Sequence, residues 1–394
     1  MHDELDNGHG SSRVKMFKHS HEIISGHTSS RSIAFIGFDI NDAIYNYKNC
    51  DSHAEIISNS NRIINLIDTC GYKKYMKTNL YTFSIYNLQY NIFIIDDQML
   101  YLNQLENVML LKIPILLVVN KFDKIKKNNR ENSVLKTIHV IASMITPTSD
   151  PFFISNDQDI EKAMPSFLKG LICPVITVSC VTGQNLNLLR LFLSSVPSPN
   201  TLDQLKFESV RFEISKVHNR EDGVIVVGRL ISGRISLQDA LFIGPNINGD
   251  FIKVSAQSIE QNHSKTNTIF AGQQSGINLG FISGCKIRAG MVIIDTHLNA
   301  IPCKEFMASI TVFSQHHLFV GLEVPINVCS IRQIVKIIDI PETVEKGKPC
   351  LIKFKFKHRI ECIKVMSKII IRFNKLVAKG FVSSIIKFKL PKII

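Results

Sequence analysis

The chain has 394 residues, and its 46 lysine and arginine residues against 33 aspartate and glutamate residues give a formal net charge of +13. This length predicts about two to four domains, and 45% hydrophobic with 20% charged residues excludes a disordered, collagen-like or coiled-coil protein. No apolar run is long enough to span a bilayer, and the polar N-terminus lacks the apolar stretch of a signal peptide, so we expect a cytoplasmic protein without a membrane partner.

The first half of the chain alternates short apolar runs with longer amphipathic stretches, a pattern typical of strands joined by helices. Because the runs are almost continuously apolar, they predict parallel strands buried on both faces. The predicted strands are residues 33–38, 63–67, 92–95, 115–119 and 175–178, and the predicted helices are residues 72–87, 101–111 and 185–193.

The pattern changes after Val196-Pro197-Ser198-Pro199-Asn200, where two prolines bar regular structure. Short strands with turns between them follow, at 212–217, 224–230, 240–243 and 251–254, then at 306–313, 326–338, 351–356, 369–373 and 381–388. Turn signals include Asp222-Gly223. Strands at this spacing favour two β-barrels, with a boundary near Pro302.

The strand at 63–67 ends in Asp68-Thr69-Cys70-Gly71. In a nucleotide-binding α/β domain, the Asp68 carboxylate can reach Mg²⁺ through water, and the Gly71 amide can donate to a γ-phosphate. This four-residue pattern is weak taken singly, because an ordinary turn between a strand and a helix has the same composition.

The strand at 115–119 runs into Asn120-Lys121-Phe122-Asp123. The Asp123 carboxylate can accept hydrogen bonds from N1–H and the exocyclic amine of guanine, which adenine does not offer, and the wrong base would leave buried polar groups unpaired. Asn120 would anchor the loop and contact the purine, and the Lys121 stem would cover a ring face. A solvated polar turn is the alternative interpretation of this motif taken singly.

A third loop, Ser179-Cys180-Val181-Thr182, follows the last apolar strand. A backbone amide at Cys180 or its neighbour could meet guanine O6, with Thr182 as a helix cap. All three loops follow predicted parallel strands, whose carboxyl ends bind ligands in open α/β sheets, and their order favours a guanine nucleotide.

These motifs and several longer strings give the chain a resemblance to translational GTPases of the elongation factor Tu type, and within them to the GTP-binding protein 1 and 2 subgroup. The resemblance covers almost the whole length. The strings are residues 4–8 (Glu-Leu-Asp-Asn-Gly), 21–30 (His-Glu-Ile-Ile-Ser-Gly-His-Thr-Ser-Ser), 37–39, 73–78, 181–186 and 330–333 (Ser-Ile-Arg-Gln).

The resemblance implies a P-loop NTPase-like α/β GTP-binding domain followed by two β-barrel domains, with Mg²⁺ and GTP or GDP as ligands. Thr28 matches the first-switch threonine that closes on Mg²⁺ and the γ-phosphate, and Tyr72 stands where elongation factors have the histidine that orients the attacking water. The implied division is a GTP-binding domain at 1–196, a linker at 197–204, and β-barrels at 205–302 and 303–394.

The sequence contains no Gly-x-x-x-x-Gly-Lys-Ser/Thr, the loop that cradles the β-phosphate. In the family this loop and the strand before it lie immediately before the region of residues 4–8, so we expect a chain truncated before or at the phosphate loop, with genuine loss as the alternative. The missing strand lies between those at 63–67 and 92–95, and we expect a gap or an improvised pairing there.

Two functional hypotheses follow. The first is a GTPase whose hydrolysis is coupled to engagement of RNA, either tRNA or mRNA, and of the ribosome or the RNA-processing machinery. The second is a non-hydrolysing, GTPase-like adaptor that binds RNA or protein through its barrels. The second hypothesis is favoured by Tyr72, because tyrosine, with a pKa near ~10, is a poor substitute for the imidazole of histidine at neutral pH. The lysines at 124–127 and 353–357 suit either RNA phosphates or a solvated surface.

Overall fold

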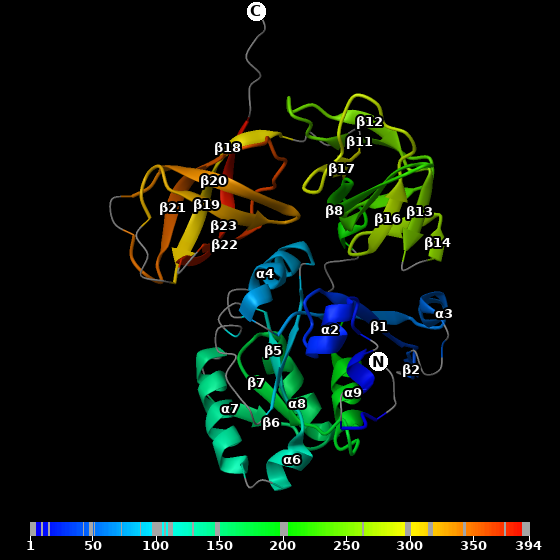
Figure 1. Ribbon diagram of the computed structural model, residues 1–394, viewed down its shortest axis with the longest axis vertical. Coiled ribbons are helices and arrows are strands. Elements are labelled where there is room, and N and C mark those ends of the chain that lie inside the picture. The colour runs from blue at the N-terminus through cyan, green and yellow to red at the C-terminus, as the bar shows by residue number, and fades with distance from the viewer. Residues whose placement is uncertain are drawn as a thin grey trace, which may run out of the picture. The chain divides into compact units, whose positions relative to one another are not determined.

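The computed structural model (Figure 1) divides the chain into two compact units, Met1–Phe83 with Asn87–Ser198 and Ser84–Tyr86 with Pro199–Ile394. The structure describes residues 5–387 except 9–10, 15, 42, 47–49, 51, 72, 87, 97–104, 106–107, 109–112, 128–129, 146–149, 198–203, 262–263, 296–300, 314–317, 342–343 and 374–375. Tyr72, most of the predicted helix at 101–111 and most of the predicted linker at 197–204 therefore lie outside the described residues.

A parallel four-stranded sheet forms the centre of the first unit. Its order is β4 (Asn91–Ile95), β5 (Ile115–Val119), β7 (Cys173–Thr177) and β6 (Pro151–Phe153). All five residues of β5 are buried, because the strand pairs with a neighbour on each side and its Ile-Leu-Leu-Val-Val sequence offers apolar side chains to both faces. The predicted parallel strands at 92–95, 115–119 and 175–178 are confirmed to within two residues at each end.

Helices pack against this sheet, and Figure 1 shows α7 (Glu131–Ile145) and α9 (Leu186–Ser195) flanking its strands. One buried core joins α8 (Asp157–Leu168) and α9 to β5 and β7 through side chains such as Phe167 and Phe192. The Asn156 side chain caps α8 by accepting the Asp159 amide at 3.0 Å. The other helices of this unit are α1 (Ser11–Val14), α2 (Ser20–Ser25), α3 (His53–Ser58), the 3-10 turn Lys73–Tyr75, α4 (Met76–Ile85) and α6 (Phe122–Lys127).

The prediction of parallel strands is wrong for the first two apolar runs. They form β1 (Ser32–Phe38) and β3 (Arg62–Asp68), which pair antiparallel in the order β2 (Ile44–Tyr45), β1, β3, with Ser32 opposite Asp68. The chain reverses through β2 and α3 between them, so no crossover helix brings β3 back parallel. No residue of β3 is fully buried, in contrast to β5.

The gap predicted between the strands at 63–67 and 92–95 is present. β3 belongs to the antiparallel sheet and β4 to the parallel one, and among the described residues no strand pairing joins them.

In the second unit, the residues after the prolines first form an eight-stranded antiparallel sheet and a two-stranded ribbon, rather than one continuously paired barrel among the described residues. Sheet and ribbon share a single core that includes Phe212, Leu230 and Ile269. The sheet order is β12 (Ile252–Ser255), β11 (Ala240–Gly244), β17 (Val292–Ile294), β8 (Arg211–Arg220), β9 (Gly223–Ser232), β16 (Gln274–Asn278), β13 (Ser258–Gln261) and β14 (Ser264–Thr266), and the ribbon is β10 (Arg234–Ser236) with β15 (Thr268–Phe270).

Gly223 closes the predicted turn between β8 and β9. Its φ is +127°, and a Cβ there would lie 2.5 Å from the backbone carbonyl carbon of Gly280. Only glycine fits both the dihedral angle and the close approach of the two backbones.

The last segment is a closed six-stranded barrel, as predicted. Its order is β18 (Cys303–Val312), β21 (Pro349–Phe356), β20 (Ile331–Asp339), β19 (Glu323–Val328), β22 (Lys368–Phe373) and β23 (Leu376–Lys387). Inward residues alternate with outward ones along β20 and β21, and Phe306, Phe354 and Phe356 pack together in its core.

The prediction of one strand over residues 326–338 is wrong, because two strands meet there in a two-residue turn. Val328 pairs with Ile331, and Cys329 between them has a φ of +51°. A cysteine rarely adopts this left-handed conformation, and the run holds no glycine, proline or aspartate at the turn, so the pattern gives no sign of the reversal.

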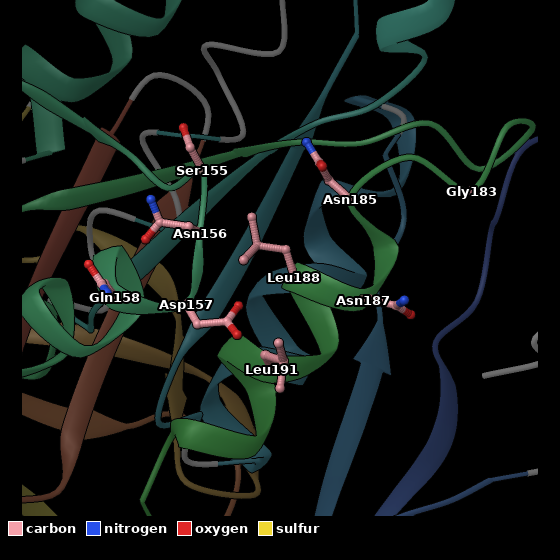
Figure 2. Close-up of a pocket in the computed structure, with 9 residues that line it drawn as sticks. All are labelled: Ser155, Asn156, Asp157, Gln158, Gly183, Asn185, Asn187, Leu188 and Leu191. Carbon is pink, nitrogen blue, oxygen red and sulfur yellow. The ribbon is translucent and has the colours of Figure 1, made fainter.

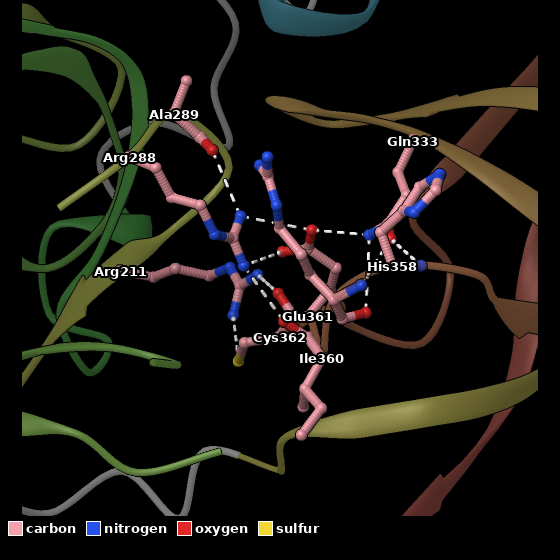
Figure 3. A network of polar contacts seen from close by, with 9 residues as sticks. Arg211, Arg288, Ala289, Gln333, His358, Ile360, Glu361 and Cys362 are labelled. Carbon is pink, nitrogen blue, oxygen red and sulfur yellow. Dashed lines mark hydrogen bonds and ion pairs between the residues drawn. The ribbon is translucent and has the colours of Figure 1, made fainter. Parts of the chain in front are cut away.

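A buried polar network joins the two β segments of the second unit (Figure 3). The Arg288 guanidinium donates to both carboxylate oxygens of Glu361, at 3.2 and 3.0 Å, and the Gln333 amide donates to Glu361 at 2.7 Å. Arg211 donates to the Cys362 carbonyl at 2.8 Å. Burial raises the pKa of Glu361 to about 6, although the Arg288 charge acts in the opposite direction.

Candidate functional site

The loop after β5 is set by the backbone of Asn120 and Lys121. The Asn120 amide donates to the Ile95 carbonyl of β4 at 2.8 Å, and the Asn120 side chain accepts the Lys121 amide at 2.8 Å. Lys121 has a φ of +59°, a left-handed conformation that turns the chain sharply into α6. Asp123 consequently lies in the first turn of that helix.

The loops after β5 and β7 meet through Asp123 and Ser179. The Ser179 hydroxyl donates to Asp123 Oδ1 at 2.6 Å and accepts the Thr182 amide at 3.2 Å. It therefore acts as a donor toward Asp123 and as an acceptor toward Thr182. Ser179 is buried, and its loop is closed by the Gly183 amide on the Ser179 carbonyl.

Cys180 belongs to the same cluster. The Cys180 side chain forms a hydrogen bond with the Asn120 side chain. Burial raises the pKa of the Cys180 thiol. The amide of Asp6 donates to the Cys180 carbonyl at 2.9 Å, so the segment around residues 5–8 reaches this loop as well. The structure therefore brings four of the predicted residues together, namely Asn120, Asp123, Ser179 and Cys180.

The Lys121 ammonium lies 2.6 Å from the Asp96 carboxylate, immediately after β4. Lys121 retains 39% of its side-chain exposure and Asp96 21%. Sequence reasoning missed Asp96, although its place directly after an apolar strand, like that of Asn120, was a usable signal.

Thr28 and Asp68 form a second group of predicted residues. The Thr28 hydroxyl donates to Asp68 Oδ2 at 3.4 Å, across 40 residues of sequence. The next loop residues are held by buried Asn79, whose side chain accepts the Cys70 amide at 3.1 Å and donates to the Cys70 carbonyl at 2.6 Å. Burial, followed by the Asp68 charge, raises the pKa of the Cys70 thiol to about 11, so it stays neutral.

Gly71 is exposed, and a Cβ on it would meet open space. Within the described part of the chain, no cluster of three or more His, Cys, Asp or Glu side chains could hold a metal ion. Thr28 and Asp68 offer a hydroxyl and a carboxylate instead, and such oxygen donors suit Mg²⁺.

Glu22 on α2 is the second residue that sequence reasoning missed. It is fully buried, and its carboxylate accepts hydrogen bonds from residues 18, 19, 29 and 30 on either side of Thr28. Burial acts to raise the pKa of Glu22, but the hydrogen bonds from Ser29, Lys18 and His19 outweigh it and hold the pKa well below its usual range. An acidic residue between His21 and Ile23 in a short helix carried no signal of this role.

A separate open pocket of about 760 Å³ lies between the starts of α8 and α9 (Figure 2). It is lined by Ser155, Asn156, Asp157, Gln158, Gly183, Asn185, Asn187, Leu188 and Leu191. These residues come from 155–158 and 183–191, and neither Asp123 nor Ser179 is among them. None of the helices described here is long and apolar enough to cross a membrane.

Residues 4–198 match the family model for the elongation factor Tu GTP binding domain. The chain is 28% identical over 389 residues to GTP-binding protein 2 of Homo sapiens, covering 96% of this chain and 64% of that protein. It is 28% identical over 401 residues to GTP-binding protein 1 of Xenopus laevis, covering 98% of this chain and 60% of that protein. The chain thus spans less than two thirds of the length of either relative.

Two solved structures of elongation factors have a similar fold. The bacterial selenocysteine-specific elongation factor EF-Sec superposes with a TM-score of 0.64 at 15% identity, over 93% of this chain and 53% of that one. Elongation factor SelB from Methanococcus maripaludis, in complex with the GTP analogue GppNHp, superposes with a TM-score of 0.60 at 14% identity, over 84% of this chain and 72% of that one. At such identity the likeness establishes the fold alone.

Proposed function

Because residues 4–198 match the family model for the elongation factor Tu GTP binding domain, we propose that this chain is a guanine-nucleotide-binding protein of the translation elongation factor type. In the same proposal, GTP hydrolysis is coupled to engagement of RNA or the ribosome. The observation that carries it is the hydrogen bond between Ser179 and Asp123, which joins the loops after two adjacent parallel strands.

The base would be recognised by Asp123. Ser179 uses one lone pair of Oδ1, and a carboxylate offers about four acceptor sites, so capacity remains for the N1–H and exocyclic amine of guanine. Holding the carboxylate in place before the base arrives lowers the entropic cost of binding. Asn120 and the Cys180 backbone complete the proposed base pocket, and the Lys121 stem would cover the ring.

The phosphate end would lie at Thr28, Asp68 and Gly71. Thr28 and Asp68 would hold Mg²⁺, with Asp68 acting through water, and the ion would neutralise charge on the β- and γ-phosphates. In the same proposal, the Gly71 amide would donate to the γ-phosphate. Tyr72 would orient the attacking water in place of histidine.

Engagement of RNA or the ribosome is proposed from the fold and the net charge of the whole chain, and not from particular residues. The relatives that share its fold include elongation factors, and the net charge of +13 favours a polyanionic partner. We propose a cytoplasmic protein for the same reasons.

Isothermal titration with GDP and ADP in the presence of Mg²⁺ tests the nucleotide proposal. We expect GDP to bind with a preference over ADP of roughly 100-fold or more, because adenine would leave Asp123 unpaired. Equal affinities, or no binding of either nucleotide, would contradict it. A chain that binds GDP but shows no GTP turnover above the rate without protein would support the non-hydrolysing adaptor instead.

A further inference from the structure

The Glu22 carboxylate accepts six hydrogen bonds from two short segments of the chain. Oε2 accepts the amides of Lys18 at 2.7 Å and His19 at 3.0 Å. Oε1 accepts the amide and hydroxyl of Ser29, at 2.6 and 2.7 Å, and those of Ser30, at 2.9 and 3.3 Å. All six donors are backbone amides or hydroxyls, and Glu22 itself is fully buried.

A carboxylate bonded in this way acts as a fixed anchor. Its low pKa keeps it ionised at neutral pH, and an ionised carboxylate accepts hydrogen bonds about twice as strong as those between neutral groups. A buried charge that lost these donors would be left uncompensated. The segments on either side therefore stay attached to α2.

Glu22 holds both ends of the loop that carries Thr28, one through its backbone carbonyl and the other through its carboxylate. α2 ends at Gly26, which has a φ of +66° and donates its amide to the Glu22 carbonyl at 2.8 Å. The chain then passes through His27 and Thr28 before Ser29 and Ser30 return to the Glu22 side chain. Only two residues span the interval, so the Thr28 hydroxyl is held toward Asp68.

Ser29 also contacts His21, with 2.7 Å between its hydroxyl and His21 Nε2, but the pair is not an activated nucleophile. The single hydroxyl proton of Ser29 goes to ionised Glu22, which can only accept. His21 must then donate to Ser29 rather than take its proton. The contact belongs to the same anchor.

We propose that Glu22 is a positioning residue for the Mg²⁺ end of the site, because its carboxylate holds the loop that carries Thr28 against Asp68. This inference rests on the proposed function, in which Thr28 and Asp68 hold the ion. Glu22 has no role in contacting nucleotide or metal directly.

The test is Glu22→Gln in the full chain, compared with Glu55→Gln. Glu55 is the third residue of α3, another six-residue helix, but its side chain is exposed. In E22Q one acceptor oxygen becomes an NH₂ group that faces amide donors. We expect amide exchange at residues 28–30 to rise roughly 10-fold or more, and E55Q to leave it unchanged.

The second measurement is the Mg²⁺ concentration that gives half-maximal GDP binding. Residues that orient metal ligands typically change metal affinity by about 10- to 100-fold when substituted, so E22Q should raise this concentration by that factor. GDP affinity in EDTA should change less than about twofold, since the base contacts are untouched. Ser29→Ala removes only one of the six hydrogen bonds, so it should raise the Mg²⁺ requirement by a smaller factor than E22Q does. This variant keeps the test valid if E22Q does not fold.

An unchanged Mg²⁺ requirement in E22Q and S29A, with GDP still bound, would overturn the positioning role alone. Equal losses of GDP affinity with and without Mg²⁺ would also overturn it, because they indicate a merely structural residue. No GDP binding by the unsubstituted chain would instead overturn the proposed function, and the positioning role with it.

Discussion

At the residue scale, specificity in the proposed site depends on single hydrogen-bonding groups at Asp123 and Ser179. Ser179 is buried and uses its only proton on Asp123, so the orientation of the carboxylate is fixed by a residue 56 positions away. Lys121 is oriented in the same manner by Asp96. Asp123 and Lys121 thus each have a partner that follows a neighbouring strand.

Asp123→Asn should shift nucleotide preference from guanine toward xanthine. The amide can donate to the xanthine carbonyl, whereas the carboxylate only accepts, and loss of a charged hydrogen bond should weaken GDP binding roughly 10- to 100-fold. Titration with GDP and XDP measures both effects. Asp157→Asn, also in the first turn of a helix but exposed, should change neither affinity; unaltered GDP and XDP affinities in D123N would remove Asp123 from the site.

At the element scale, local backbone geometry decides where strands reverse. The β8–β9 turn depends on Gly223, whose absent side chain lets the Gly280 backbone approach, while the β19–β20 turn uses a cysteine in the left-handed region. The first reversal was predicted from Asp222-Gly223, and the second has no comparable signal.

Gly223→Ala should destabilise the second unit by about 1 to 3 kcal/mol or more, because the new Cβ would overlap the Gly280 backbone in addition to the strain of a positive φ. Urea unfolding measures the change. Gly284→Ala is the matched control, since Gly284 has a φ of +80° and open space where its Cβ would lie. Equal losses in the two variants would show that close approach to Gly280 contributes nothing.

The edges of β3 and β4 should be less stable than the strands of the closed barrel. Each of the two strands has a sheet partner on one side among the described residues, and β3 is only half buried, whereas barrel strands are paired on both sides. Hydrogen exchange at residues 63–67 and 92–95 should therefore be faster than in the barrel strands. Protection equal to that of the barrel would mean that the two sheets have joined.

At the scale of the whole molecule, a buried carboxyl group, that of Glu361, links the two β segments of the second unit. Arg288 from the first segment and Gln333 from the second both bond Glu361, which is 2% exposed. Gln333 also accepts the amides of His358 and Arg359, at 3.0 and 2.7 Å, and so fixes the segment that carries Glu361. The domain boundary at residues 302 and 303 stays a prediction.

The stability of this unit should fall as pH rises from about 4.5 to about 6. The pKa of Glu361 is raised from 4.5 to about 6 in the folded state, so protonation favours folding, and ionisation costs up to about 2 kcal/mol at 1.36 kcal/mol per pKa unit. The difference in urea midpoint between the chain and Glu361→Gln, measured at pH 4.5 and 7, isolates this contribution. A difference in urea midpoint that is the same at pH 4.5 and at pH 7 would contradict this prediction.

The sequence by itself determined the local features of this protein. Apolar runs located β5, β7 and most of the barrel strands, because burial of both faces or alternate faces leaves a periodic pattern. The motifs at Asp68, Asn120 and Ser179 were visible because their positions directly follow such strands. The resemblance to elongation factor Tu-type GTPases rested on longer strings of residues.

Only the tertiary structure decided which distant groups meet. Two features of the backbone became visible only in the tertiary structure, namely the antiparallel pairing of β1 with β3 and the turn at Cys329. The same is true of two sets of contacts, those of Asp96 with Lys121 and those of Glu22 with Ser29 and Ser30. Hydrophobic periodicity reports how deeply a residue is buried and does not by itself decide strand direction, since β5 is parallel to its neighbours and β1 is antiparallel to β3. Hydrogen-bond partners depend on distances of a few ångströms between segments whose approach the whole fold sets.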